Sequence, residues 1–177
     1  MAVLVEATSI IIRVQAIHAH YPGGWLSFTQ NVPNRTFCSD DEVARIGFMS
    51  PTDCKASIER LGDHGIMFLK DERSSDLVIA DQMRGFTVAC DWAEFGRIEI
   101  RPGQTVSAAQ LKDTTNRRLF CPDDWKYEGS LSEQFGFIPA GTEYKSLRLL
   151  RHEKGLDVYL NLVTGREVYV GRTLAKS

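Results

Sequence analysis

The chain has 177 residues, of which 43% are apolar and 25% charged, and a formal net charge of −2 at pH 7. A chain of this length suits one domain and buries roughly 70% of its unfolded surface, so its core needs no disulfide or metal. The slightly acidic balance argues against a generally basic nucleic-acid binder, and no apolar run approaches the roughly 20 residues that cross a bilayer.

The ends of the chain and its cysteines indicate a compartment. Residues 1–5 are apolar but lack a charged leader and a long apolar core, and Glu6 interrupts them, so we expect no signal peptide. The four cysteines, at positions 38, 54, 90 and 121, form no CxxC pair and are typical of reduced, mostly buried thiols. We therefore expect a cytoplasmic protein.

The first 40 residues predict a strand and a short helix. Residues 3–14 are rich in Val and Ile and predict the first strand. A turn is expected at 21–24, and Trp25, Phe28 and Val32 then recur at helical spacing. Residues 36–38 fit a brief strand.

The segment 42–70 carries the plainest pattern, which is strand, helix, strand. Residues 43–48 begin with β-favouring side chains. Ser50 fits an N-cap, with Pro51 at the first helical position and Asp53 as a capping partner. An apolar run at 66–69 has strand length. One apolar stripe is expected along the helix, formed by Cys54, Ile58 and Leu61.

Downstream, residues 66–80 predict a hairpin with a six-residue loop, and 85–90 a further strand. Residues 98–101 alternate and end at Pro102 and Gly103, a turn pair. Residues 103–142 have no dependable periodicity.

The C-terminal end predicts a β-meander. Apolar and polar residues alternate over 157–163. Thr164 and Gly165 form a hairpin signal, and residues 166–170 predict the next strand. Residues 145–152 fit a third strand or a short helix, and we favour the strand. The sequence thus predicts one α+β domain over residues 1–177, with a mainly antiparallel or mixed sheet and two or three packed helices.

Catalytic patterns are weak. There is no GxxxxGK[ST], GxGxxG or GxSxG motif, so we expect no nucleotide cofactor and no cofactor of any other kind. His18 and His20 would share one side of a strand, but further metal ligands cannot be named, so no metal is expected. The adjacent Asp40 and Asp41 are typical of solvated loop or helix-cap charges. A Cys/His enzyme remains an alternative, with thiols and bases drawn from Cys90, Cys121, His64 and His152.

Two stretches fit protein binding better than packing alone, because Trp and Arg are enriched at the centres of interfaces. The first runs from Pro22 through Trp25 to Thr36, and the second spans residues 91–96. A core role for Trp25 and Trp92 is the competing interpretation, since Trp is largely buried on average. The candidate protein-binding residues are Trp25, Asn34, Arg35, Asp91, Trp92 and Glu94.

The motifs YPGGW and VPNRTFC, between Tyr21 and Cys38, resemble sequences of uncharacterised bacterial cytosolic proteins of similar length. The resemblance implies a bacterial cytosolic origin and brings no activity. From the residues we expect a non-enzymatic protein-binding module, of which an immunity protein that neutralises a toxin is one form. Its partner would have a basic surface, since residues 1–142 carry a net charge of −5 and residues 143–177 carry +3. A small Cys/His or His–metal enzyme is the alternative, and a sheet-face binder of nucleic acid or a small ligand is the third.

Overall fold

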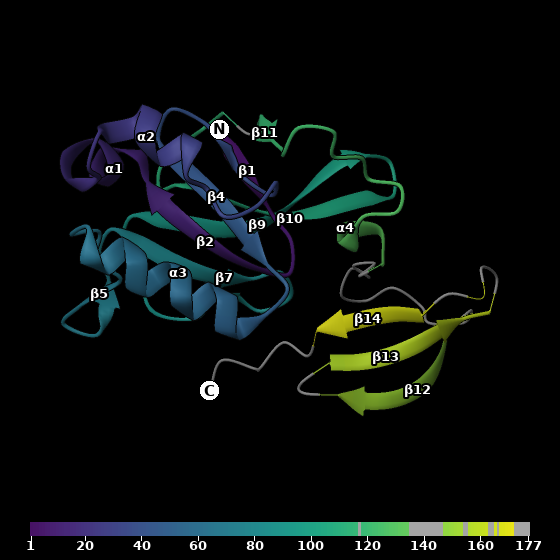
Figure 1. The fold of residues 1–177 in the computed structure, drawn as a ribbon. Coiled ribbons are helices and arrows are strands. Elements are labelled where there is room, and N and C mark those ends of the chain that lie inside the picture. The colour runs from purple at the N-terminus through teal and green to yellow at the C-terminus, as the bar shows by residue number, and fades with distance from the viewer. Residues whose placement is uncertain (117, 135–146, 154–155, 163–164, 166, 172–177) are drawn as a thin grey trace. The chain divides into compact units, whose positions relative to one another are not determined.

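A computed structural model describes residues 1–116, 118–134, 147–153, 156–162, 165 and 167–171 (Figure 1). They form two compact units, one made of residues 1–98 and 107–125 and the other of 99–106 and 126–177. The α+β class is confirmed, with antiparallel and mixed sheets and helices. A single domain over residues 1–177 stays a prediction.

The first unit is built around a five-stranded antiparallel sheet whose central strand is β2 (Thr8–Arg13). Residues 10–12 of β2 are fully buried, as expected of a strand with both faces covered. β2 pairs with β4 on one side and with β7 on the other. The remaining strands in spatial order around β2 are β3 (Cys38–Ser39), β4 (Val43–Phe48), β7 (Leu77–Asp81) and β8 (Gly85–Phe86).

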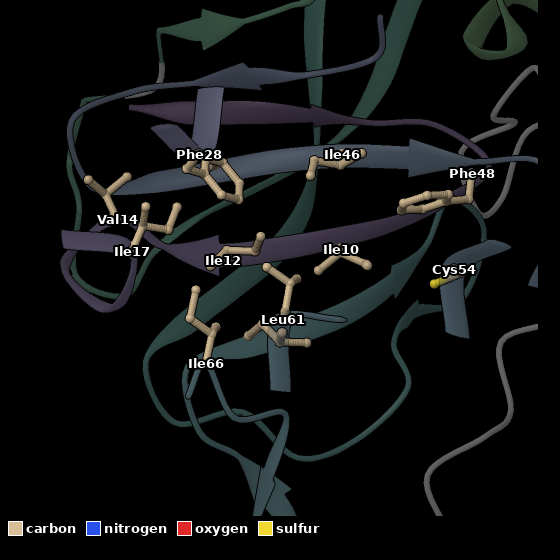
Figure 2. Close-up of a cluster of buried hydrophobic side chains, with 12 residues drawn as sticks. Ile10, Ile12, Val14, Ile17, Phe28, Ile46, Phe48, Cys54, Leu61 and Ile66 are labelled. Carbon is tan, nitrogen blue, oxygen red and sulfur yellow. The ribbon is translucent and has the colours of Figure 1, made fainter. Parts of the chain in front are cut away.

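Three helices pack on one face of this sheet, where Ile10 and Ile12 point (Figure 2). Ile17 and Phe28 come from the first two helices, and Leu61 comes from the third. These apolar contacts fix the helices on the sheet, because each buried side chain of this kind contributes about 1.5–3 kcal/mol. The helices are α1 (Val14–His20), α2 (Gly24–Gln30) and α3 (Pro51–Asp63).

A second sheet lies against the other face of β2, so the first unit has a helix layer and two sheet layers. Ile11 points to that side and joins a second apolar cluster with Val3, Val5 and Ala109. The second sheet is mixed, since β1 is antiparallel to β10 and parallel to β11. Its strands in spatial order are β11 (Leu119–Phe120), β1 (Ala2–Val5), β10 (Gln104–Leu111) and β9 (Ala93–Arg101).

The expectation of one strand over residues 3–14 was wrong. The chain forms two strands in two different sheets, and Ala7 between them has a φ of 51°. The Ala7 N–H donates to Gln82 Oε1 at 2.9 Å, which holds this bend. From Val14 the chain is helical, so His18 and His20 lie on α1 rather than on a strand. The helical spacing of apolar residues explains this helix, because Val14 and Ile17 lie three positions apart and are both buried.

The helix start at Ser50 is confirmed: Ser50 is the N-cap, its Oγ accepts from the Asp53 N–H at 3.5 Å, and Pro51 is the first helical residue. The strand expected at 66–69 is reduced to β5 (Leu69–Lys70), which pairs with β6 (Arg73–Ser74). The strand expected at 85–90 is present only as β8.

The C-terminal meander is confirmed in the second unit, where three antiparallel strands follow one another. They are β12 (Leu147–Glu153), β13 (Leu156–Asn161) and β14 (Glu167–Gly171). The turn residue Thr164 lies outside the described residues. Within 103–142 the chain forms β10, β11 and the single-turn α4 (Leu131–Gln134), while residues 135–142 also lie outside them.

Candidate functional site

The turn between α1 and α2 sets Trp25 beside the end of β2. Gly23 precedes α2 with a φ of 81°, in the left-handed region that favours glycine. A Cβ on Gly23 would lie 2.7 Å from Ser27 Cβ, so a larger residue is excluded there. Trp25 then stacks with His18 of α1, with ring centroids 6.0 Å apart and planes 29° apart.

Trp25 is half-buried and belongs to an aromatic group rather than standing alone on the surface. Its ring centroid is 6.0 Å from that of Phe28 and 6.0 Å from that of Phe37. Packed aromatic pairs of this kind add roughly 0.5–1.5 kcal/mol each beyond buried area. The ring is therefore held in place and presents a fixed edge to its surroundings.

A cavity of about 500 Å³, which we call the Trp25 cavity, opens beside this ring. Two other cavities of the first unit measure about 210 and 190 Å³. The lining of the Trp25 cavity combines apolar and acidic residues from the N-terminus, α1, α2, β11 and the β3–β4 segment. It comprises Met1, Val14, His18, Trp25, Ser39, Asp40, Asp41 and Phe120.

Asp40 is the unusual member of this lining, because its carboxylate is buried and only half satisfied. The residue is 6% exposed. Its Oδ1 accepts from the N–H groups of Glu42 and Val43, each at 2.7 Å, which closes the β3–β4 turn. Its Oδ2 has no hydrogen-bond partner among the described residues. The expectation that Asp40 is a solvated loop charge was wrong, whereas Asp41 is exposed.

Trp92 contacts Arg13, the last residue of β2, whereas the next residue, Val14, lines the Trp25 cavity. The Arg13 guanidinium sits 5.7 Å from the Trp92 ring centroid, and Val14 lines the cavity. Trp92 is half-buried, and its Nε1–H donates to Ser74 Oγ at 2.9 Å. The two tryptophans predicted from sequence therefore pack on opposite faces of β2, Trp25 with the cluster of Ile10 and Ile12 and Trp92 with the cluster of Ile11.

Asp91 extends this surface and is exposed. The Arg73 Nε–H donates to Asp91 Oδ2 at 2.8 Å, and a second contact makes the pair bidentate. The hydrogen bond from Arg73 lowers the pKa of the Asp91 carboxyl below its usual 3.8. We call Arg13, Arg73, Ser74, Asp91 and Trp92 the Trp92 patch.

The other candidate residues lie elsewhere. Asn34 donates from Nδ2 to the Gly47 carbonyl at 2.8 Å, and its Oδ1 accepts from the Thr36 N–H at 2.9 Å, so it fastens a loop to the far end of β4. Arg35 is exposed on that loop. Glu94 is exposed and lines the cavity of about 190 Å³.

Two thiols, Cys38 and Cys121, are poorly prepared for nucleophilic chemistry. Burial raises the pKa of Cys38 to about 12, against the partial offset of Arg45. Burial also raises the pKa of Cys121 to about 11, with a further contribution from Glu6. A catalytic thiol needs the opposite shift.

His64 lies edge-on to Tyr21, 4.8 Å between centroids, and lines the cavity of about 210 Å³, which no cysteine borders in the described part of the first unit. Within the described ranges, no three His, Cys, Asp or Glu residues are grouped to hold a metal ion.

Sequence reasoning missed Asp40, although one signal was present. An Asp two or three residues before a β-type run is the pattern in which a side chain accepts from the following backbone N–H groups. That pattern predicts the turn but not the burial of the second oxygen.

Comparison with known proteins finds no matching family, no matching curated protein and no matching solved structure. No helix in the described residues is both long enough and apolar enough to cross a membrane.

Proposed function

We propose that this chain is a non-enzymatic protein-binding module of the bacterial cytoplasm, and that its candidate binding surfaces are the Trp25 cavity and, separately, the Trp92 patch. The observation that carries the proposal is the Trp25 cavity, in which a half-buried tryptophan packed against Phe28 and Phe37 shares one lining with Asp40 and Asp41. Tryptophans held by packing are the commonest anchors of protein interfaces. Immunity against a toxin is the concrete form we favour.

Charge supports a basic partner. Asp40 and Asp41 line the cavity, and residues 1–142 carry a net charge of −5. An acidic binding surface speeds encounter with a basic protein and disfavours acidic competitors. Proteins that neutralise a toxin need this combination of fast association and selectivity.

The alternative of a Cys/His enzyme has less support, because the pKa values of Cys38 and Cys121 are raised rather than lowered. The third hypothesis is a sheet-face binder of nucleic acid or a small ligand, and the net charge of −2 opposes its nucleic-acid form.

The test is capture of a partner from the native bacterium, followed by reconstitution with the purified partner or with the product of the adjacent gene. Isothermal titration with the wild type should give a 1:1 complex. Trp25→Ala should weaken it at least 30-fold, as expected of a central anchor. Met49→Ala is the matched control, because Met49 is 78% exposed just past the opposite end of β4.

For the immunity form, co-expression of this chain should rescue growth of cells that make the partner, and the Trp25→Ala variant should fail to do so at equal abundance. A purified complex whose affinity is unchanged by both Trp25→Ala and Trp92→Ala would overturn the proposed surface. Failure to reconstitute any complex would overturn the function.

A further inference from the structure

We infer that the cavity of about 210 Å³ between α2 and α3 binds a small carboxylate that carries one apolar ring. In the described part of the chain it shares no lining residue with the Trp25 cavity, so the inference does not rest on the proposed function. We call it the Arg60 cavity. The lining residues on which the argument depends are Tyr21, Val32, Pro33, Ser57, Arg60 and His64.

One face of α3 supplies the polar wall of the Arg60 cavity. Ser57, Arg60 and His64 follow one another at spacings of three and four residues, so they lie on the same side of the helix and its C-cap. The Arg60 Nη2–H donates to Ser57 Oγ at 3.2 Å. Ser57 is buried and Arg60 is exposed, so the guanidinium is tethered to the cavity wall and stays accessible. This is the one hydrogen bond of Arg60 in the described residues, and it uses one of five N–H donors.

The charge of the lining selects an anion. Among the described residues no Asp or Glu lines the Arg60 cavity, whereas Asp40 and Asp41 line the Trp25 cavity and Glu94 lines the cavity of about 190 Å³. A guanidinium binds a carboxylate through paired N–H···O hydrogen bonds. A single cation balances the one charge of a carboxylate, while a phosphate dianion would keep a charge unpaired.

The rest of the accessible lining fits a ring. Tyr21 and Val32 are half-buried and Pro33 is exposed, so each offers surface to a ligand. The Tyr21 ring is held edge-on to Phe28 and to His64, with centroids 5.3 and 4.8 Å apart. The volume lies below the roughly 300–1,000 Å³ of sites for drug-sized ligands, so the ligand has one ring. The carboxylate belongs either to a free acid or to the C-terminal residue of a peptide.

The experiment titrates the whole chain with phenylacetate and follows its backbone amide signals by two-dimensional NMR. Phenylacetamide keeps the ring without the charge, acetate keeps the charge without the ring, and benzylamine reverses the charge. Acetyl-glycyl-phenylalanine presents a ring and a carboxylate at the end of a peptide.

We expect saturable shifts with phenylacetate, largest at the amides of residues 31–32 and 60–64. Phenylacetamide and acetate should bind at least tenfold more weakly, and benzylamine should not bind. Tighter binding of the peptide than of phenylacetate supports a site for a chain end, and the reverse order supports a site for a free acid. Equal binding of phenylacetate and phenylacetamide, shifts largest at Trp25 and Asp40, or no saturable shift with either carboxylate would each overturn the inference.

Substitution of Arg60 tests the polar wall. Arg60→Gln should weaken phenylacetate binding at least tenfold, because Arg60 lies in the last turn of α3, where the partial negative charge of the helix end disfavours an anion. Arg60→Lys keeps the charge without the paired donors, so its loss should be smaller. Arg84→Gln removes the same charge at an exposed arginine outside the cavity and should leave binding unchanged. Unchanged affinity in Arg60→Gln would overturn the inference, and the wild-type probe series decides the matter even if that variant does not fold.

Discussion

Arg45 and Asp40 are both buried charged residues of the β3–β4 hairpin, and they differ in how completely their side chains are hydrogen-bonded. Arg45 is 2% exposed, and each of its three guanidinium nitrogens donates to an oxygen of this chain: Ser9 Oγ, the Thr36 carbonyl and the Glu6 carbonyl, at 2.8–2.9 Å. Asp40 is 6% exposed and leaves one oxygen without a donor among the described residues.

The contrast separates a structural charge from a candidate binding charge. Burial lowers the pKa of Arg45, yet its hydrogen bonds hold two sheet strands and a loop together. A buried charge that is fully paired stabilises or specifies the fold, whereas one left partly unpaired costs stability.

The largest expected effect is at Arg45. Arg45→Met should lower the free energy of unfolding by about 3 kcal/mol, because the Ser9 hydroxyl and the Thr36 carbonyl lose their donor in a buried site. The measurement is a urea titration, read as a lower midpoint at an unchanged slope. Arg84→Met, at an exposed arginine, is the control. Equal midpoints for the two variants would show that Arg45 does not hold the fold.

Gly47 gives a second test of Arg45, because the missing side chain at Gly47 leaves room for the Arg45 guanidinium. A Cβ at Gly47 would lie 2.8 Å from Arg45 Cζ, and the hydrogen bonds of Arg45 keep it from moving away. Gly47→Ala should therefore lower the free energy of unfolding by about 2 kcal/mol. Gly62→Ala, in α3 with nothing within 4 Å of the new Cβ, should raise it by about 0.5–1 kcal/mol. Thermal or urea melts that give both variants the same sign would contradict this account.

Two substitutions at Asp40 test separately how much each of its two carboxylate oxygens contributes to stability. Asp40→Ala removes the acceptor of the Glu42 and Val43 N–H groups and should cost about 2 kcal/mol of stability. Asp40→Asn keeps a side-chain carbonyl for those N–H groups, so it should cost less than about 1 kcal/mol. Urea melts of the two variants test the difference. A loss in Asp40→Asn as large as in Asp40→Ala would mean that Oδ2 matters to the fold itself.

Local chemistry explains which parts of the fold could be predicted from sequence. The start of α3 depends on Ser50 and its immediate neighbours, and the meander depends on short antiparallel connections, so both follow from nearby residues. The pairing of β1 with β10 joins residues more than a hundred positions apart, and no local pattern encodes it. The break at Ala7 was hidden for the same reason, since it depends on a hydrogen bond from Gln82.

The candidate site was predictable only in its aromatic members. Trp25 and Trp92 stand out by residue type, but their packing on opposite faces of β2 depends on the folded sheet. Asp40 was missed because burial is a property of the packed chain and not of the Asp–Asp pair in the sequence. Asn34 was chosen for its neighbours in sequence and proved to fasten a loop to Gly47.

The smallest expected effect is the response of Cys38 to alkaline pH, which tests burial on the side of the hairpin next to Arg45. The pKa of Cys38 is about 12 in the folded chain, against an ordinary value of 9.0, because burial disfavours the thiolate. Its contribution to stability is therefore complete below pH 9 and is lost as the pH rises from 9 towards 12. At pH 10 the loss should be about 1 kcal/mol.

The measurement is the difference between pH 8 and pH 10 in the free energy of unfolding, compared between the wild type and Cys38→Ala so that other titrating groups cancel. The wild type should lose more than the variant. Equal losses in the wild type and the variant would show that the Cys38 thiol is exposed enough to ionise in the folded state. Cys38 would then be a candidate nucleophile.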